Sequence, residues 1–131
     1  MTTPFRCLLV VAVLPYVLAG LGGYLRIKQL GILDNNHPRI QATRLEGIAA
    51  RAWAAQANAW EALAVFGVVV IVAHLVHADP EASATAAVVY LATRIAHPVL
   101  YLANQATLRT LVFVVGLGCI ARLIQLASAA G

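Results

Sequence analysis

The sequence predicts an all-α membrane protein folded as a bundle of four transmembrane helices. Of its 131 residues, 62% are hydrophobic, and the mean hydropathy is +0.85. A chain of this length allows one domain, residues 1–131. A bilayer core of about 30 Å is crossed by about 20 apolar residues in a helix that rises about 1.5 Å per residue. Four apolar segments meet this length, so we expect helices at approximately residues 5–30, 42–77, 82–103 and 108–128.

The first helix contains an uncharged run from Cys7 to Leu25. A secretory signal peptide is the competing interpretation, because Arg6 followed by an apolar run and a small-residue site resembles such a leader. Removing this segment would leave three helices with exposed packing surfaces, so we favour a transmembrane helix. The second helix combines an amphipathic stretch, Arg39 to Glu61, with an uncharged run that follows it.

The third and fourth helices follow polar breaks at residues 77–81 and 104–107, and their apolar runs are interrupted by Arg94 and Arg122, respectively. Cys7 and Cys119 lie within apolar helices, so they indicate neither a disulfide framework nor a metal site.

Loop charges predict the orientation in the membrane, because lysine and arginine are retained on the cytoplasmic side. The first loop and its flanks are basic (Arg26, Lys28, Arg39 and Arg44), whereas the second carries Asp79 and Glu81 without a basic residue. We expect a cytoplasmic first loop with both termini outside. Short termini without a retention signal favour a bacterial inner membrane. The net charge of +4 is explained by this asymmetry and by attraction to lipid headgroups, so we expect membrane lipids and no nucleic acid as partners.

Polar side chains converge in the inner half of the membrane in this topology. On the second helix they recur every seven residues and continue one turn later: Arg44, Arg51, Asn58 and Glu61. On the third helix they fall within a band of about 80°: Tyr90, Arg94, His97, Tyr101 and Asn104. Arg109 begins the fourth helix, just after a candidate N-cap at Thr107. A polar site inside the membrane is expected, since charge there must face protein, water or ligand.

Two interpretations of these charges remain open. Glu61 with Arg51 or Arg94 could form a buried structural ion pair, and His97 alone is more typical of helix packing than of a ligand or base. One carboxylate cannot neutralise so many arginines, however, so an anionic ligand or headgroup would relieve the remaining positive field.

Four motifs resemble the MAPEG family, the membrane-associated proteins of eicosanoid and glutathione metabolism. They are DNNHPR (34–39), RAWAAQANAWE (51–61), RIAHPVLYL (94–102) and LRTLVF (108–113). In its motifs the chain resembles most nearly the microsomal prostaglandin E synthase and microsomal glutathione transferase branch, and RIAHPVLYL is especially similar to the prostaglandin E synthases. The resemblance implies a homotrimer of four-helix subunits that binds glutathione as co-substrate in clefts between subunits.

The resemblance also implies roles for individual residues. Those matched to glutathione-binding or supporting positions are Arg26, Arg51, Asn58, Glu61, Arg94, His97 and Tyr101. The arginines would bind carboxylates or orient the site, Glu61 would bind the γ-glutamyl ammonium, and Asn58 with Tyr101 would bind peptide groups. Arg109 is the catalytic candidate, because its charge and the helix N-terminus would favour a thiolate.

The chain departs from the family pattern at three positions. Ala54 replaces an arginine of the mammalian synthases, Ala62 a tyrosine of leukotriene C synthase, and Phe113 a tyrosine of the prostaglandin branch. The spacing from Tyr101 to Arg109 also differs by one residue, and eicosanoid synthesis is not expected.

The expected activity is a glutathione-dependent transferase or peroxidase acting on lipophilic electrophiles or lipid hydroperoxides. One alternative is a non-catalytic member that binds lipid or a protein partner in the same cleft. A small multidrug exporter is a remote third class, because such proteins rely on a carboxylate inside the first helix, which residues 7–25 lack.

Overall fold

The computed structural model describes all 131 residues and consists of α-helices joined by short connections. Its elements are α1 (Thr3–Leu30), α2 (Pro38–Ala42), α3 (Gly47–Leu75), α4 (Pro80–Leu102) and α5 (Ala106–Ala130). The shortest of the four long helices has 23 residues, which at about 1.5 Å per residue is enough for a bilayer core of about 30 Å. The protein is therefore an integral multi-pass membrane protein with four membrane-spanning helices.

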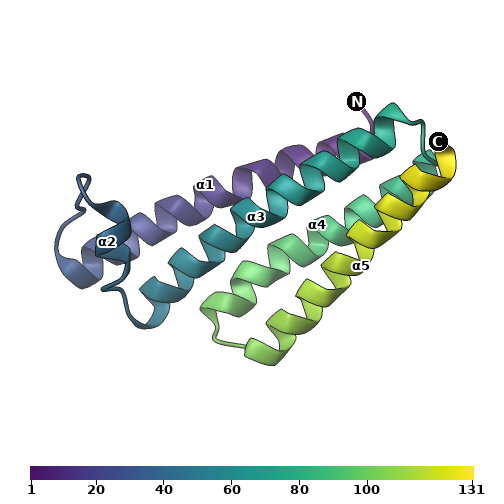
Figure 1. The fold of residues 1–131 in the computed structure, drawn as a ribbon. Helices are drawn as coiled ribbons and strands as arrows, with labels where there is room; N and C mark the ends of the chain where they lie inside the picture. Colours follow the sequence, from purple (N-terminus) through teal and green to yellow (C-terminus); the bar gives the residue numbers. More distant parts are fainter.

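The four long helices run up and down the bundle in chain order (Figure 1). α1 packs along α3, and α4 packs along α5, with further contacts between the two pairs. Both termini and the α3–α4 turn lie at one end, whereas α2 and the α4–α5 turn lie at the other (Figure 1). We call the first the terminal end and the second the loop end.

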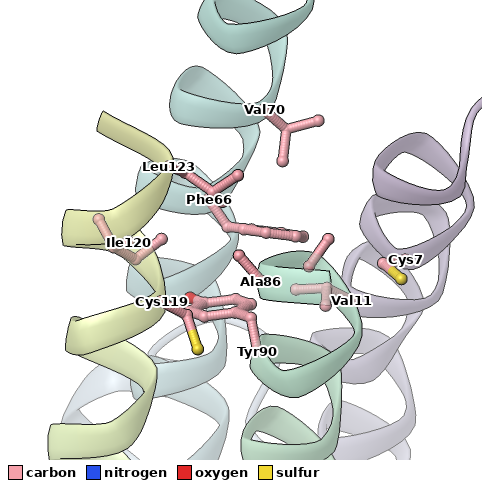
Figure 2. Packing of buried hydrophobic residues seen from close by; sticks show 10 residues of the cluster. Cys7, Val11, Phe66, Val70, Ala86, Tyr90, Cys119, Ile120 and Leu123 are labelled. Carbon is pink, nitrogen blue, oxygen red and sulfur yellow. The ribbon is translucent and has the colours of Figure 1, made fainter. Parts of the chain in front are cut away.

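The core lies where all four long helices meet, and two stacked rings form its centre (Figure 2). The rings of Phe66 and Tyr90 lie 4.2 Å apart with an interplanar angle of 20°. The Tyr90 hydroxyl donates a hydrogen bond of 3.0 Å to the Ala62 carbonyl, so its polar end is satisfied within the apolar core. Leu123 and Val11 close the cluster from α5 and α1. This core holds α3 and α4 in a fixed register.

Much of the lateral surface is apolar, as expected for helices that face lipid. Between 22% and 33% of the residues in the most apolar part of each long helix are buried inside the chain. Large exposed side chains include Val17, Val68, Leu111 and Val114. A soluble monomer rarely exposes so extended an apolar surface, which supports the transmembrane assignment.

The second membrane helix begins at Gly47, five residues later than the sequence pattern predicted. Residues 38–42 form the separate helix α2, and Gly47 follows with φ of 54°, a conformation that glycine adopts without strain. Arg44 therefore lies in a turn before α3, and its predicted place on the stripe with Arg51 and Asn58 is wrong.

The start of α5 also differs from the expectation. Its N-cap position is Gln105, which makes no side-chain capping bond, and Thr107 lies inside the helix, so the predicted cap at Thr107 is wrong. Asn104 lies in the preceding turn with φ of 59° and is therefore not part of the polar face of α4.

Candidate functional site

Arg94 is the most deeply buried cation of the predicted site, at 5% exposure. Its guanidinium carbon lies 5.2 Å from the Tyr90 ring centroid and 5.9 Å from that of Phe113. Its Nε donates to the Thr93 hydroxyl at 3.4 Å, whereas Nη2 is buried without a hydrogen-bond partner. A buried donor on a charged group is costly when unsatisfied, so Nη2 of Arg94 would gain from an acceptor.

Gly116 makes room for this guanidinium. A Cβ added at Gly116 would lie 2.8 Å from Arg94 Nη2 and 3.1 Å from Thr93 Oγ1. No larger residue fits without displacing one of these groups. Gly116 lies seven residues after Arg109, so both share one face of α5.

A cavity of about 160 Å³ lies beside Arg94, between α3, α4 and α5. Asn58, Glu61 and Arg94 line it together, which brings one amide, one carboxylate and one guanidinium to a common space. Val65 and Leu117 also line the cavity and are exposed on the side of the bundle. The cavity is therefore accessible from the lateral, lipid-facing surface.

His97 lies one turn after Arg94 on the same helix and is buried. It shares a small gap in the packing with Asn58 and Arg94. Its ring is 5.7 Å from that of Tyr101 in an edge-on arrangement. His97 thus connects the group around Arg94 with the aromatic ring nearer the loop end.

Arg109 is placed against Tyr101. The guanidinium carbon lies 4.1 Å from the ring centroid, a cation–π contact between the first turns of α5 and the end of α4. Such stacking orients a guanidinium while leaving its N–H groups in the ring plane free to donate. Arg109 itself is half-buried, so its charge remains accessible.

Arg51 joins α3 to the end of α4. Its Nε donates a hydrogen bond of 3.2 Å to the Leu102 carbonyl, one of the carbonyls that the helix end leaves without an intrahelical partner. Arg51 therefore combines a structural contact with a position at the loop end of the polar cluster.

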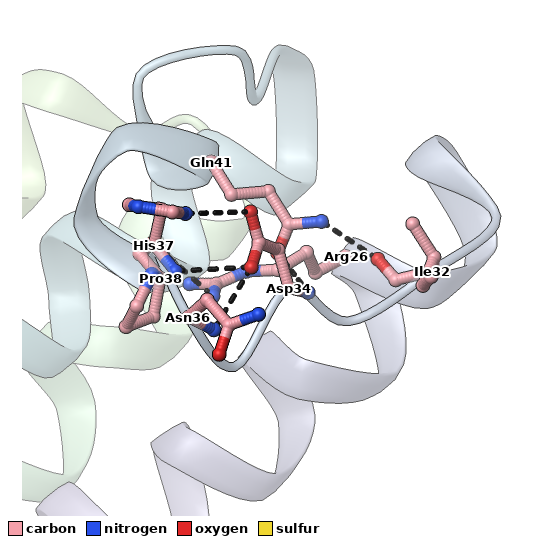
Figure 3. Close-up of polar contacts among 7 residues, drawn as sticks. All are labelled: Arg26, Ile32, Asp34, Asn36, His37, Pro38 and Gln41. Atoms are coloured by element: carbon pink, nitrogen blue, oxygen red, sulfur yellow. Dashed lines mark hydrogen bonds and ion pairs between the residues drawn. The ribbon is translucent and has the colours of Figure 1, made fainter.

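Arg26 has a different environment from the other predicted residues. Its guanidinium carbon lies 5.0 Å from the Trp53 ring centroid, and Nη1 donates to the Pro38 carbonyl at 3.4 Å (Figure 3). It does not line the cavity beside Arg94. These contacts tie the connection between α1 and α3 to both helices, so the structure gives Arg26 a positioning role for this loop.

The loop that Arg26 holds has its own hydrogen-bond network (Figure 3). The Asp34 carboxylate accepts the backbone N–H groups of Asn36 at 2.9 Å and His37 at 3.0 Å. The hydrogen bond from His37 is the largest influence that lowers the pKa of Asp34 below its ordinary value. Gln41 accepts from the Asp34 N–H and donates to the Ile32 carbonyl at 2.7 Å. The loop is thus folded on itself.

Charges in the polar cluster are not matched within the chain. The ion pair of Asp34 with His37, 3.7 Å apart, is the only one present. Glu61 is exposed and pairs with no arginine, so the expected alternative of a structural ion pair with Arg51 or Arg94 is wrong for a single chain. The arginines contact aromatic faces and backbone carbonyls instead, and neither carries a negative charge.

Two residues of this arrangement were not anticipated from the sequence, Thr93 and Gly116. Thr93 precedes Arg94, and its hydroxyl could have been expected to accept from a neighbouring donor. Gly116 could have been found by its seven-residue spacing from Arg109, which puts a small residue on the polar face of α5.

The structure thus joins Asn58, Glu61 and Arg94 around one cavity, with His97 adjoining it. Arg51, Tyr101 and Arg109 lie nearer the loop end, and Arg26 is separate.

Comparison with known proteins agrees with this architecture. No curated protein and no solved structure matches the chain significantly. The family profile described as MAPEG family matches residues 3–129, which is nearly the whole chain and includes all four membrane-spanning helices. The chain therefore belongs to the MAPEG family.

Proposed function

We propose that the protein is a membrane-bound glutathione transferase or peroxidase that acts on lipophilic electrophiles or lipid hydroperoxides. The observation that carries this proposal is the buried Arg94, whose Nη2 has no hydrogen-bond partner and which lines a cavity together with Asn58 and Glu61. A buried cation without a counterion favours an anionic ligand.

The chemistry of these groups fits glutathione, which carries two carboxylates, one ammonium, two amides and a thiol. Arg94 and Arg51 would bind carboxylates, because guanidinium groups donate paired hydrogen bonds to them. Glu61, which forms no ion pair within the chain, would bind the ammonium. Asn58 and Tyr101 would hydrogen-bond the peptide groups.

Arg109 would stabilise the negative charge of the thiolate, since it has no carboxylate partner and the Tyr101 ring fixes its orientation. A cation near a thiol lowers the thiol's pKa and raises the population of the reactive form at neutral pH. Glutathione supplies the sulfur nucleophile. The second substrate would enter from the bilayer between Val65 and Leu117, whose exposed side chains line the same cavity.

One chain provides only part of such a site. Its cavity of about 160 Å³ is smaller than the roughly 300–1,000 Å³ usual for ligand pockets. We therefore propose that neighbouring subunits of a homotrimer complete it, with the first loop cytoplasmic. Crosslinking in native membranes would test the oligomer, and a purely monomeric protein would contradict this part.

Calorimetric titration with glutathione and S-hexylglutathione tests the binding function, the second ligand lacking a free thiol. We expect Glu61→Gln to weaken both ligands by about tenfold, as for loss of one charged hydrogen bond. Arg122→Ala is the matched control, because Arg122 lies further along α5, is exposed and bonds only Gln125. Absence of glutathione binding at millimolar concentration would refute the proposal.

Ultraviolet absorbance of the thiolate tests the catalytic step. Wild-type protein should show the signal on addition of glutathione, Arg109→Ala should lose it, and Arg122→Ala should retain it. A bound acyl chain, together with no thiolate signal in any variant, would favour the non-catalytic lipid-binding alternative instead.

A further inference from the structure

A second cavity lies at the terminal end of the bundle, opposite the polar cluster. Its volume is about 400 Å³, within the range of small-molecule sites. It lies between the first turn of α1, the end of α3 and the first turns of α4, with Leu123 of α5 also on its wall. No residue of the candidate glutathione site lines it.

The polar lining of this cavity consists of imidazoles and hydroxyls. The residues are His74, His77, Thr2, Thr3 and Ser83. No carboxylate, lysine or arginine lines the cavity. The lining therefore offers several hydrogen-bond donors and no carboxylate that would repel an anion.

Ser83 supplies an observation that is independent of the cavity's shape. The residue is 6% exposed, and its Oγ is buried without a hydrogen-bond partner in the chain. Buried hydroxyls are normally satisfied, and an orphaned one costs about 1–3 kcal/mol. A ligand in the cavity would give this hydroxyl its missing partner.

Local backbone structure favours an anion over a cation. The N-terminus of α1 opens at the cavity, and Thr2 at the N-cap position makes no side-chain capping bond. Uncapped N–H groups at a helix start carry partial positive charge. Asp79 and Glu81, the acids nearest in sequence, both lie outside the lining, and Asp79 accepts the Ala82 N–H at 2.7 Å at the start of α4.

His77 adopts a backbone conformation that is uncommon outside glycine, with φ of 57°. Backbone hydrogen bonds from His77 N to His74 O and from Ala78 N to Ala73 O hold this turn. The turn places two imidazoles, three residues apart, on the same cavity.

We propose that this cavity is a second ligand site, which takes a phosphate group through the imidazole and hydroxyl donors of His74, His77 and Ser83. The apolar part of the wall, formed by Val70, Ala73 and Leu123, suits the carbon skeleton of a phosphate ester. Such a group could come from a lipid headgroup of the adjoining leaflet or from a soluble phosphate. The inference does not depend on the proposed glutathione chemistry, because the two sites share no residue.

Calorimetry of the delipidated full chain in a phosphate-free, non-ionic detergent tests the site. The probes are inorganic phosphate, glycerol 3-phosphate and short-chain phosphatidylglycerol. We expect binding of at least one probe, weakened about tenfold in Ser83→Ala and in His74→Gln. His37→Gln is the matched control, because this histidine is exposed in the loop at the opposite end.

The three probes distinguish the sources of phosphate. Binding of the lipid alone identifies a headgroup site, whereas binding of inorganic phosphate or glycerol 3-phosphate identifies a soluble ligand. Absence of binding by all three probes, or equal affinity in wild type, Ser83→Ala and His74→Gln, overturns the proposal.

A labelling experiment covers the case in which these variants fold poorly. Ala84→Cys places a thiol at a half-buried position on the cavity wall, and the native thiols of Cys7 and Cys119 are buried, so wild-type protein gives the background rate. An anionic methanethiosulfonate should react several-fold faster than a cationic one, and phosphatidylglycerol or glycerol 3-phosphate should slow the reaction. Equal rates without protection by either ligand refute an anion site.

Discussion

Replacing Gly116 with alanine is the most direct test of how the buried guanidinium is confined. The added Cβ would lie 2.8 Å from Arg94 Nη2 and 3.1 Å from the Thr93 hydroxyl, both closer than normal contact. The end of an arginine side chain is usually free to move away. Here the guanidinium of Arg94 lies near the rings of both Tyr90 and Phe113, which limit the space available for that movement.

The magnitude follows from two opposing effects. Alanine is better than glycine inside a helix by about 0.5–1 kcal/mol, because it loses less backbone entropy. Inserting a methyl group into a filled space costs about 1–3 kcal/mol. Whether Gly116→Ala raises or lowers the free energy of unfolding depends on the difference between these two effects. A second glycine is therefore needed to measure the helical preference alone.

Gly118 provides this control on the same helix, because a Cβ there meets nothing within 4 Å. Gly118→Ala should gain the helical preference without a clash. We expect Gly116→Ala to be less stable than Gly118→Ala by about 1–3 kcal/mol. The assay is reversible unfolding of both variants in mixed micelles, followed by circular dichroism.

Ligand affinity gives a second, functional measurement on the same pair. Displacement of Arg94 should weaken S-hexylglutathione in Gly116→Ala but not in Gly118→Ala. Equal stability of the two variants, with equal affinity, would show that the guanidinium has room to move and that our account of its confinement is incorrect.

Three further predictions concern the core and the loop. Tyr90→Phe removes one buried hydrogen bond to α3 and should lower the free energy of unfolding by about 1 kcal/mol, measured in micelles. Trp53→Leu removes the ring on which Arg26 stacks, so amide exchange in the loop after α1 should accelerate. The pKa of Asp34 is lower in the folded protein than in the unfolded chain, so its carboxylate stabilises the loop at pH values above the unfolded-state pKa. This stabilisation is lost as the pH falls through the pKa of the folded state. The protection of the His37 amide from exchange, measured relative to its intrinsic rate, should therefore fall at acid pH, whereas Asp34→Asn should show no such change in protection.

The four spans were predictable because the bilayer imposes a strong constraint on sequence. Long apolar runs have few alternatives there, and all four expected helices are present, with boundaries that shift by up to five residues. The break before Gly47 was missed, since an amphipathic stretch at the membrane surface has the same periodicity whether or not the helix is continuous.

The candidate site was predictable only at the level of which helix face is polar. The angular positions of residues around each helix placed Asn58, Glu61 and Arg94 on converging faces, and these three residues do line one cavity. Phase could not show that Arg26 is held by Trp53 and a backbone carbonyl, because such contacts depend on side-chain rotamers and on the path of the loop.

The turn between α4 and α5 is only three residues long, residues 103–105, and Arg109 follows within the next helical turn. A bundle that crosses the bilayer along its length would keep this charge at a shallow depth, close to the boundary between headgroups and acyl chains. For the proposed transferase or peroxidase, amphiphiles whose reactive carbon or peroxide reaches the level of Arg109 should be preferred over compounds that cannot approach this boundary. The selectivity of such a protein would depend on the depth at which a molecule resides in the leaflet as much as on the molecule's shape.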